Sequence, residues 1–192
     1  MATKNADTKK LALLALLTAL TAVLSILGGF IKIGSLASIS LTLIPIVLGS
    51  ALCGTGAGAW LGGVSGAAFF LTPDAAFWTG INLAGTVITV MIKGIAAGAA
   101  AGAVYKLLSR FNKYAAVLVS AIVCPVVNTG IFIAGCFVFF MDVVNSGAAA
   151  EKMSTWGYLL IFFVGLNFVF ELLVNVVLSP VILRLINIKN RK

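Results

Sequence analysis

Long runs of apolar residues, separated by short polar segments, dominate the pattern of this chain. The runs fall near residues 11–30, 38–53, 56–72, 81–107, 114–141 and 156–186. An α-helix needs about 17–25 predominantly apolar residues to cross the hydrocarbon core of a bilayer. The pattern therefore predicts an all-α integral membrane bundle of six transmembrane helices, in a single transmembrane domain over residues 1–192, with residues 1–10 as a cytoplasmic tail.

The second and third runs are shorter than the others, and helix-breaking residues interrupt them. Pro45 lacks a backbone donor, and Gly54, Thr55 and Gly56 form a turn signal. The combined stretch is too long for one helix and too apolar for a loop. It is expected to cross the bilayer twice, as two tight spans or as two tilted, broken segments.

Cations gather in three clusters, each at the end of an apolar run. The clusters contain Lys4, Lys9 and Lys10; Lys106, Arg110 and Lys113; and Arg184, Lys189, Arg191 and Lys192. Cytoplasmic segments of membrane proteins are enriched in Lys and Arg, so all three clusters, and both termini with them, are predicted to be cytoplasmic. Two crossings by the short runs agree with this assignment, because one crossing would carry the middle cluster to the other face.

The composition excludes a soluble domain and a nucleic-acid partner. Apolar residues make up 61% of the 192 residues and charged residues 9%, and the mean hydropathy is +1.17, whereas soluble domains are about 45–50% apolar. The net charge is +8, but no aromatic residues that could stack on bases interleave with the cations. Membrane topology explains the charge.

No enzyme activity, metal or cofactor is expected. Histidine is absent and the three cysteines form no C-x-x-C pair, so zinc, haem and redox sites lack their usual ligands. The segment from Gly63 to Gly66 resembles the serine motif of an intramembrane protease, but the chain has no histidine to serve as the base. It also has no Gly-Lys-Ser/Thr loop for ATP.

Polar residues within the apolar runs are the main candidates for solute binding. Asn167, Glu171 and Asn175 are spaced by four residues, so they share one face of the last helix. A carboxylate at this depth is costly unless it is paired or hydrated, so Glu171 is expected to face the interior and to contact a donor. Lys93 in the fourth run is the expected partner. The two form either a structural ion pair or part of a solute site.

A second group of polar residues lies near Pro125 in the fifth run. The proline frees the carbonyl of Ala121, which must find another partner or line a cavity. Asn128 and Thr129 follow one turn later and are candidates to line that cavity. A simple kink without function is the alternative.

Two stripes of glycine indicate close contacts between helices. Gly54, Gly58, Gly62 and Gly66 recur every four residues, and Gly94, Gly98 and Gly102 do the same in the fourth run. Helices in a bilayer associate through close packing, and small residues mark their contact faces. The stripes predict tight packing within the chain or, alternatively, a sliding face for another subunit.

Aromatic residues mark the longer outer loops, near residues 73–80 and 142–155. Trp78, Trp156 and Tyr158 lie at the ends of these loops. Trp and Tyr concentrate at both membrane interfaces, so these side chains are expected to anchor the helices there. The alternative is that they form walls or a lid over a binding site.

Several segments together resemble the substrate-binding subunits, or S components, of the energy-coupling factor (ECF) vitamin transporters of prokaryotes. The resemblance covers nearly the whole chain. It rests on the basic start and alanine-rich first run from Lys9 to Ala22, on Pro45 leading to Gly49 and the glycine-rich turn Cys53–Gly63, and on Met91-Ile92-Lys93-Gly94 continuing to Tyr105.

The resemblance implies a subunit in the prokaryotic cell membrane that captures a vitamin from the outer side. It would associate with a membrane coupling subunit and two ATPase subunits, and the small-x-x-x-small pair that faces the coupling subunit maps onto Ala15 and Ala19. The expected substrate-binding residues are Lys93, Asn128, Asn167 and Glu171, with Trp78, Trp156 and Tyr158 as walls. No signature selects one vitamin.

Two other functions stay open. A self-sufficient carrier coupled to protons or sodium would protonate and release Glu171 during its cycle. A membrane assembly subunit without a solute would depend on the glycine stripes and tolerate loss of Lys93 or Glu171.

Overall fold

The described residues fold into helices, most of which follow one another closely along the chain. The computed structural model describes residues 2–31 and 40–190, and these contain no strand. The elements are α1 (Ala2–Phe30), α2 (Leu43–Cys53), α3 (Thr55–Phe69), α4 (Pro73–Ile81), α5 (Leu83–Leu108), α6 (Lys113–Phe139), α7 (Met141–Ala150), α8 (Thr155–Tyr158), the π-helix η1 (Leu159–Gly165) and α9 (Leu166–Asn190). The all-α prediction is confirmed for this part of the chain.

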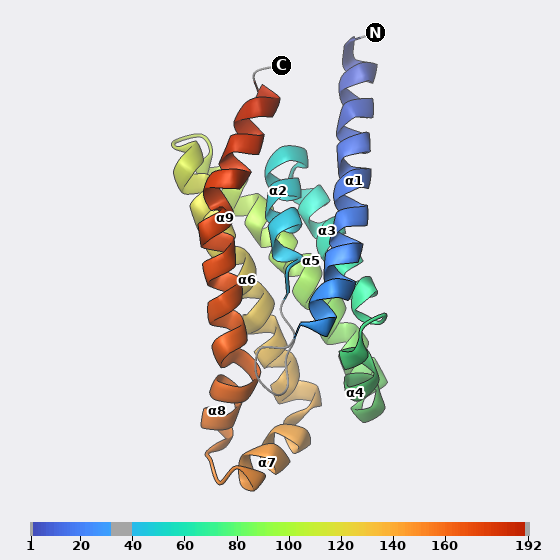
Figure 1. Cartoon of the computed structure of the whole chain (residues 1–192), viewed down its shortest axis with the longest axis vertical. Coiled ribbons are helices and arrows are strands. Elements are labelled where there is room, and N and C mark those ends of the chain that lie inside the picture. Colours follow the sequence, from blue (N-terminus) through green and yellow to red (C-terminus); the bar gives the residue numbers. More distant parts are fainter. Residues whose placement is uncertain (1, 32–39, 191–192) are drawn as a thin grey trace.

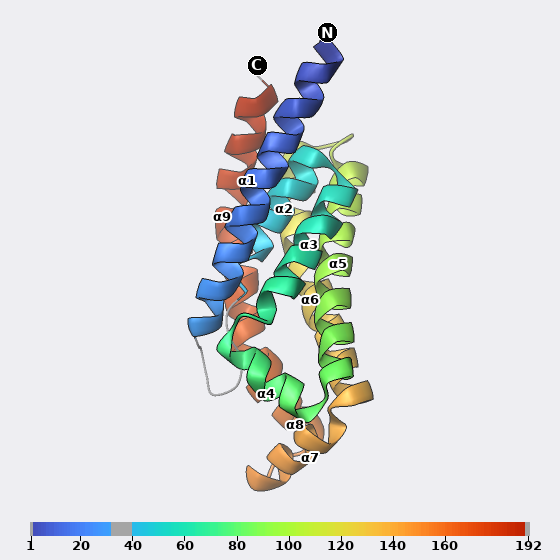
Figure 2. The same ribbon diagram turned by 90° about the vertical axis from the view of Figure 1, so that its right-hand side faces the viewer.

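The long helices lie lengthwise beside one another. Helices α1, α3 and α6 run in one direction along the long axis, and α2, α5 and α9 run in the other (Figures 1 and 2). Both ends of the chain and the α5–α6 turn lie at one end of the molecule, whereas α4, α7 and α8 lie at the opposite end. The segments that carry the three basic clusters therefore share one end.

Four helical stretches in the described part of the chain are long and apolar enough to span a membrane. These are Thr8–Phe30, Leu83–Leu108, Lys113–Phe139 and Asn167–Ile188. Helices α2 and α3 have 11 and 15 residues, which at about 1.5 Å per residue cover roughly half to three-quarters of a hydrocarbon core of about 30 Å. The short runs thus form broken segments, and six crossings stay a prediction.

Segments expected to be loops are helical. Residues 73–80 fall in α4, where Pro73 occupies the first turn and Asp74 follows at the positive end of the helix dipole. Residues 142–150 fall in α7, which begins with an acidic residue in its first turn and ends in alanines. The segment expected as a cytoplasmic tail, residues 1–10, is helical from Ala2 onward as part of α1. Pro73 and Asp142, in the first turns of α4 and α7, are local helix-start signals that hydropathy alone does not reveal.

The glycine stripes pack against each other between α3 and α5. A Cβ atom at Gly62 would overlap the backbone of Gly94, and one at Gly58 would overlap the backbone of Gly98; the reciprocal overlaps hold as well. The two backbones therefore meet directly, as expected for small residues at a helix contact in a bilayer. Both stripes are used within the chain, except at Gly54. That glycine ends α2 with a positive φ of 98° and has no neighbour where its Cβ would be.

Proline residues lie inside two long helices without ending them. Pro125 lies in α6 and Pro180 in α9. Pro180 cannot donate to the carbonyl of Val176, but the hydroxyl of Ser179 donates to that oxygen at 2.7 Å. A side chain thus replaces the lost backbone donor, which is how a proline is tolerated in a helix that water does not reach.

Two clusters of buried apolar side chains hold the bundle together. One includes Leu17, Val47 and Leu61 from α1, α2 and α3, together with residues of α5, α6 and α9. The other includes Trp78 and Phe140 and extends through α7 and α8. The first reaches toward the chain termini and the second toward the opposite end. Residues of both clusters line one cavity, whose wall also carries polar side chains.

Candidate functional site

A cavity of about 130 Å³ lies among α1, α2, α3, α4, α5, α6 and α9. This volume is about tenfold the roughly 10–15 Å³ that one water molecule requires. Among the residues that the structure describes, the ionisable ones on the wall are Asp74, Lys93 and Glu171, and the amides are Asn128 and Asn167; hydroxyl and aromatic side chains also line it. Most of them come from the halves of the long helices nearest α4, α7 and α8.

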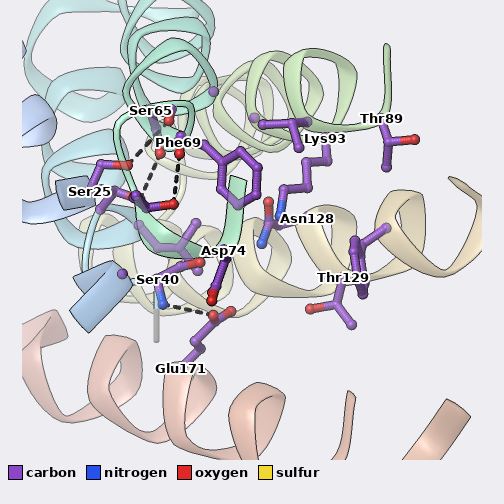
Figure 3. A pocket seen from close by; sticks show the side chains of 18 of the residues that line it. Ser25, Ser40, Ser65, Phe69, Asp74, Thr89, Lys93, Asn128, Thr129 and Glu171 are labelled. Carbon is purple, nitrogen blue, oxygen red and sulfur yellow. Dashed lines mark hydrogen bonds between the residues drawn. The ribbon is translucent and has the colours of Figure 1, made fainter. Parts of the chain in front are cut away.

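Lys93 extends from α5 into the cavity (Figure 3). Its ammonium nitrogen lies 5.0 Å from the centroid of the Phe132 ring and 6.0 Å from that of Phe69. Both distances allow attraction between the cation and the electron-rich ring faces. The rings hold the ammonium at the cavity surface, but they accept no conventional hydrogen bond and leave its three donors available.

Glu171 enters the cavity from α9 on a different side. The carboxyl group is buried, with 5% of the residue exposed, and its Oε1 accepts a hydrogen bond from the backbone N–H of Ser40 at 3.0 Å (Figure 3). The expected contact with Lys93 is not an ion pair in this structure. Instead, the two side chains line one cavity, with Lys93 over aromatic rings and Glu171 bound to the start of the α2 segment.

The residues near Pro125 line the cavity, as the alternative to a simple kink predicts. Asn128 and Thr129 both belong to its wall, and Asn128 is buried with 7% of the residue exposed. Asn167 lines the cavity from α9. Asn175 does not: its amide nitrogen donates to the Glu171 carbonyl at 2.8 Å. Asn175 therefore stabilises the α9 backbone below the cavity.

Asp74 is a cavity residue within the segment near residues 73–80, which the hydropathy pattern predicts to be an outer loop. It is 9% exposed and lines the cavity together with Glu171. Figure 3 shows both carboxyl groups pointing into the same part of the cavity. The Thr72-Pro73-Asp74 sequence is a helix-start signal that could have placed Asp74 on the first turn of a helix. Its proximity to α9 depends on tertiary packing.

The predicted aromatic residues have different locations. Trp78 lines the cavity and makes edge-to-face contacts with Phe132 and Phe140, at centroid distances of 5.6 and 5.0 Å. Tyr158 is buried in the cluster at the α7 and α8 end, and Trp156 is 61% exposed with its ring 4.8 Å from that of Phe137. Neither belongs to the cavity wall. Of the described side chains, the rings that line the cavity besides Trp78 are Phe69, Phe132, Phe140 and Phe168.

A chain of hydroxyl groups connects the helices on the α1 side of the cavity. Ser65 of α3 donates to the hydroxyl of Thr42 at 2.9 Å, and Ser25 of α1 donates to the Ser65 carbonyl at 3.2 Å (Figure 3). These bonds fix the residues preceding α2 against α1 and α3. They also hold Ser40 close enough to bind Glu171.

Ala15 and Ala19, the predicted partner-contact pair, lie on the surface of α1. Both residues are exposed, whereas Leu17 between them is buried in the core. The alanine face of α1 is therefore exposed, and it lies nearer the N-terminus than the cavity residues Ser25 and Gly29 do.

Comparison with known proteins gives one family. Residues 9–183 match the family model described as "ECF transporter, substrate-specific component". Neither the curated proteins nor the solved structures contain a match to the chain.

Proposed function

Because the chain belongs to the substrate-specific components of ECF transporters, a family of multi-pass membrane proteins, we propose that it captures a vitamin or related micronutrient for an ATP-driven importer. The observation that carries the proposal is the polar cavity that combines Lys93, Asn128 and Glu171 with aromatic walls. Binding sites for small molecules are concave, mostly apolar and furnished with a few convergent polar groups.

The location of the cavity agrees with capture from outside the cell. Its residues lie toward α4, α7 and α8, at the end opposite the segments with the basic clusters. By the positive-inside rule the basic end is cytoplasmic, so the cavity is in the outer half of a prokaryotic cell membrane. A solute would enter near α4 and α7.

The chemistry of binding follows from the wall. Asn128 and the Lys93 ammonium supply donors, Glu171 supplies an acceptor, and Trp78 and Phe132 supply apolar faces. Hydrogen bonds to charged groups are short and strong, and a cavity shielded from bulk water strengthens them further. The site fits a compact polar solute with a planar part.

Members of this family act together with membrane and ATPase subunits, and the exposed alanine face of α1 is the proposed contact for the coupling subunit. Ala15 and Ala19 leave a smooth groove between bulky exposed leucines. Small residues allow the close approach of another helix in a bilayer. The two ATPase subunits would supply the energy that this chain cannot.

The proposal is tested by purifying the chain alone in detergent and screening riboflavin, thiamine, biotin, pantothenate and folate by thermal shift and calorimetry. A true ligand stabilises the folded state by an amount that grows with the logarithm of its concentration relative to Kd. Saturable binding without other subunits is expected. Absence of binding by all five vitamins would contradict the proposal.

A transport assay separates the proposal from a self-sufficient carrier. Proteoliposomes that contain only this chain should bind the ligand but accumulate none under a proton or sodium gradient. Accumulation driven by either gradient would instead support a carrier in which Glu171 exchanges a proton. A chain that only assembles partners would keep its activity after Lys93→Ala and Glu171→Gln.

A further inference from the structure

The described cavity wall carries more acidic groups than basic groups. Two carboxyl groups, of Asp74 and Glu171, line the cavity with one ammonium group, of Lys93; the other described wall residues carry no charge. The two carboxyl groups come from α4 and α9 and point into the same part of the cavity (Figure 3). With all three groups ionised, the described wall carries a net charge of −1.

The positive and negative groups of the cavity wall come from different elements. Lys93 belongs to α5, and Asn128 lies beside it on α6. The carboxyl groups come from α4 and α9, and α9 also carries the amide of Asn167. Aromatic rings, including Phe132 and Trp78, lie beside both groups of side chains. A ligand within this wall meets donors on one edge, carboxylates on another and rings on its faces.

The amide of Asn128 is the buried neutral group that faces the cavity beside Lys93. The residue is 7% exposed, and its side chain reaches into the cavity (Figure 3). Buried polar groups in folded proteins are nearly always satisfied. An amide at this position can donate to, and accept from, a molecule bound in the cavity.

We propose that the ligand of this cavity is a planar nitrogen heterocycle with a positively charged or amino-substituted edge and a hydrogen-bond acceptor on another edge. The amino or cationic edge binds Asp74 and Glu171, and the acceptor binds Lys93 and Asn128. The ring packs against Phe132 and Trp78, where a cationic ring gains from the electron-rich faces. A solute whose only charge is a carboxylate is disfavoured, because it meets two like charges. This inference rests on the proposed function and narrows it.

Four probes with different charges test the inference on the purified chain. Thiamine carries a cationic ring and an aminopyrimidine, riboflavin is neutral, and pantothenate and biotin are acids. Calorimetry is expected to give saturable binding of thiamine with the highest affinity of the four. Tightest binding of pantothenate, biotin or riboflavin would overturn the inference while leaving a solute-binding function intact. Binding of none would overturn both.

Charge variants give a second, independent readout. Asp74→Asn and Glu171→Gln should each weaken thiamine binding by about tenfold or more, since each removes a charge-assisted hydrogen bond. Asp74→Glu, which keeps the charge, should retain more affinity than Asp74→Asn. Asp142→Asn on the exposed face of α7 is the matched control and should change nothing. Thermal unfolding without ligand establishes that each variant is folded, and unchanged affinity in folded Asp74→Asn and Glu171→Gln would contradict the inference.

Discussion

The Lys93 ammonium is held over two aromatic rings deep in the bundle, although the carboxyl groups of Asp74 and Glu171 line the same cavity. Burying a charge without a close counter-ion costs free energy unless other groups compensate. The rings of Phe69 and Phe132 provide part of that compensation, and in the proposed function an acceptor on the ligand provides the rest. The binding role proposed for Lys93 rests on this arrangement.

Replacing Lys93 by Met tests the proposed binding role of this residue. Methionine keeps the unbranched shape and the contact with the rings but removes the charged donor. We expect the affinity for the ligand to fall by about tenfold or more, as for loss of a hydrogen bond to a charged group, with little change in thermal stability. Lys106→Met, at an exposed position at the end of α5, is the control. A large loss of stability with unchanged affinity would indicate a structural role.

Part of the site could be predicted from the sequence, because a polar residue inside an apolar run can be recognised in a single helix. Burying such a residue in a membrane is costly, so it needs a partner. Lys93, Asn128, Asn167 and Glu171 interrupt apolar runs, and all four line the cavity. Asp74 does not interrupt such a run, and its role depends on how α4 folds back toward α9. The placement of the Lys93 ammonium over two rings likewise depends on the positions of Phe69 and Phe132. The spacing of apolar residues does not distinguish these two phenylalanines from lipid-facing residues.

At the scale of the elements, the α3–α5 contact determines the geometry of the bundle. The two glycine stripes bring the backbones together without intervening side chains. Lys93 immediately precedes Gly94, and Phe69 ends α3 only a few residues after Gly66. The same contact that packs the helices therefore places a cation and one of its rings at the cavity. Period-four glycines predicted a close contact, but not which two helices would share it.

Adding one methyl group at this contact should destabilise the protein. In Gly62→Ala the new Cβ overlaps the Gly94 backbone, and overpacking of this kind costs about 1–3 kcal/mol. Gly56→Ala on the same helix has open space and should keep or slightly raise stability through helix propensity. Thermal unfolding in detergent compares the two. Equal effects of both substitutions would argue against direct backbone contact.

The hydrogen bond that Ser179 makes beside Pro180 is expected to stabilise α9. Ser179→Ala leaves the Val176 carbonyl without the hydroxyl that now donates to it, so we expect a loss of about 1 kcal/mol or more in the free energy of unfolding. In a Pro180→Ala background the backbone N–H is restored, and the same serine substitution should cost less. A double-mutant cycle measures the difference. Additive effects would show that the hydroxyl does not compensate for the proline.

At the scale of the whole molecule, the three basic segments share one end and the cavity lies toward the other. The sequence predicted this polarity from the positions of its cations, because the positive-inside rule acts on the ends of helices whatever their packing. It left open whether the second and third runs form two tight spans or two tilted, broken segments, and it did not reveal that α4 and α7 lie at the cavity end as helices. Those features depend on where the helices are interrupted and on the residues at their ends.

Labelling of single introduced cysteines in intact cells tests the central claim, that the cavity end faces outward and the basic end faces the cytoplasm. The native cysteines Cys53, Cys124 and Cys136 are buried, so the unmodified chain is the control for background labelling. Ala149→Cys on the exposed face of α7 and Phe111→Cys in the α5–α6 turn, where Phe111 is 86% exposed, report the two ends without removing a cation. We predict that a membrane-impermeant maleimide labels Ala149→Cys from outside and Phe111→Cys only after the cells are permeabilised. Labelling of Phe111→Cys in intact cells would contradict the account.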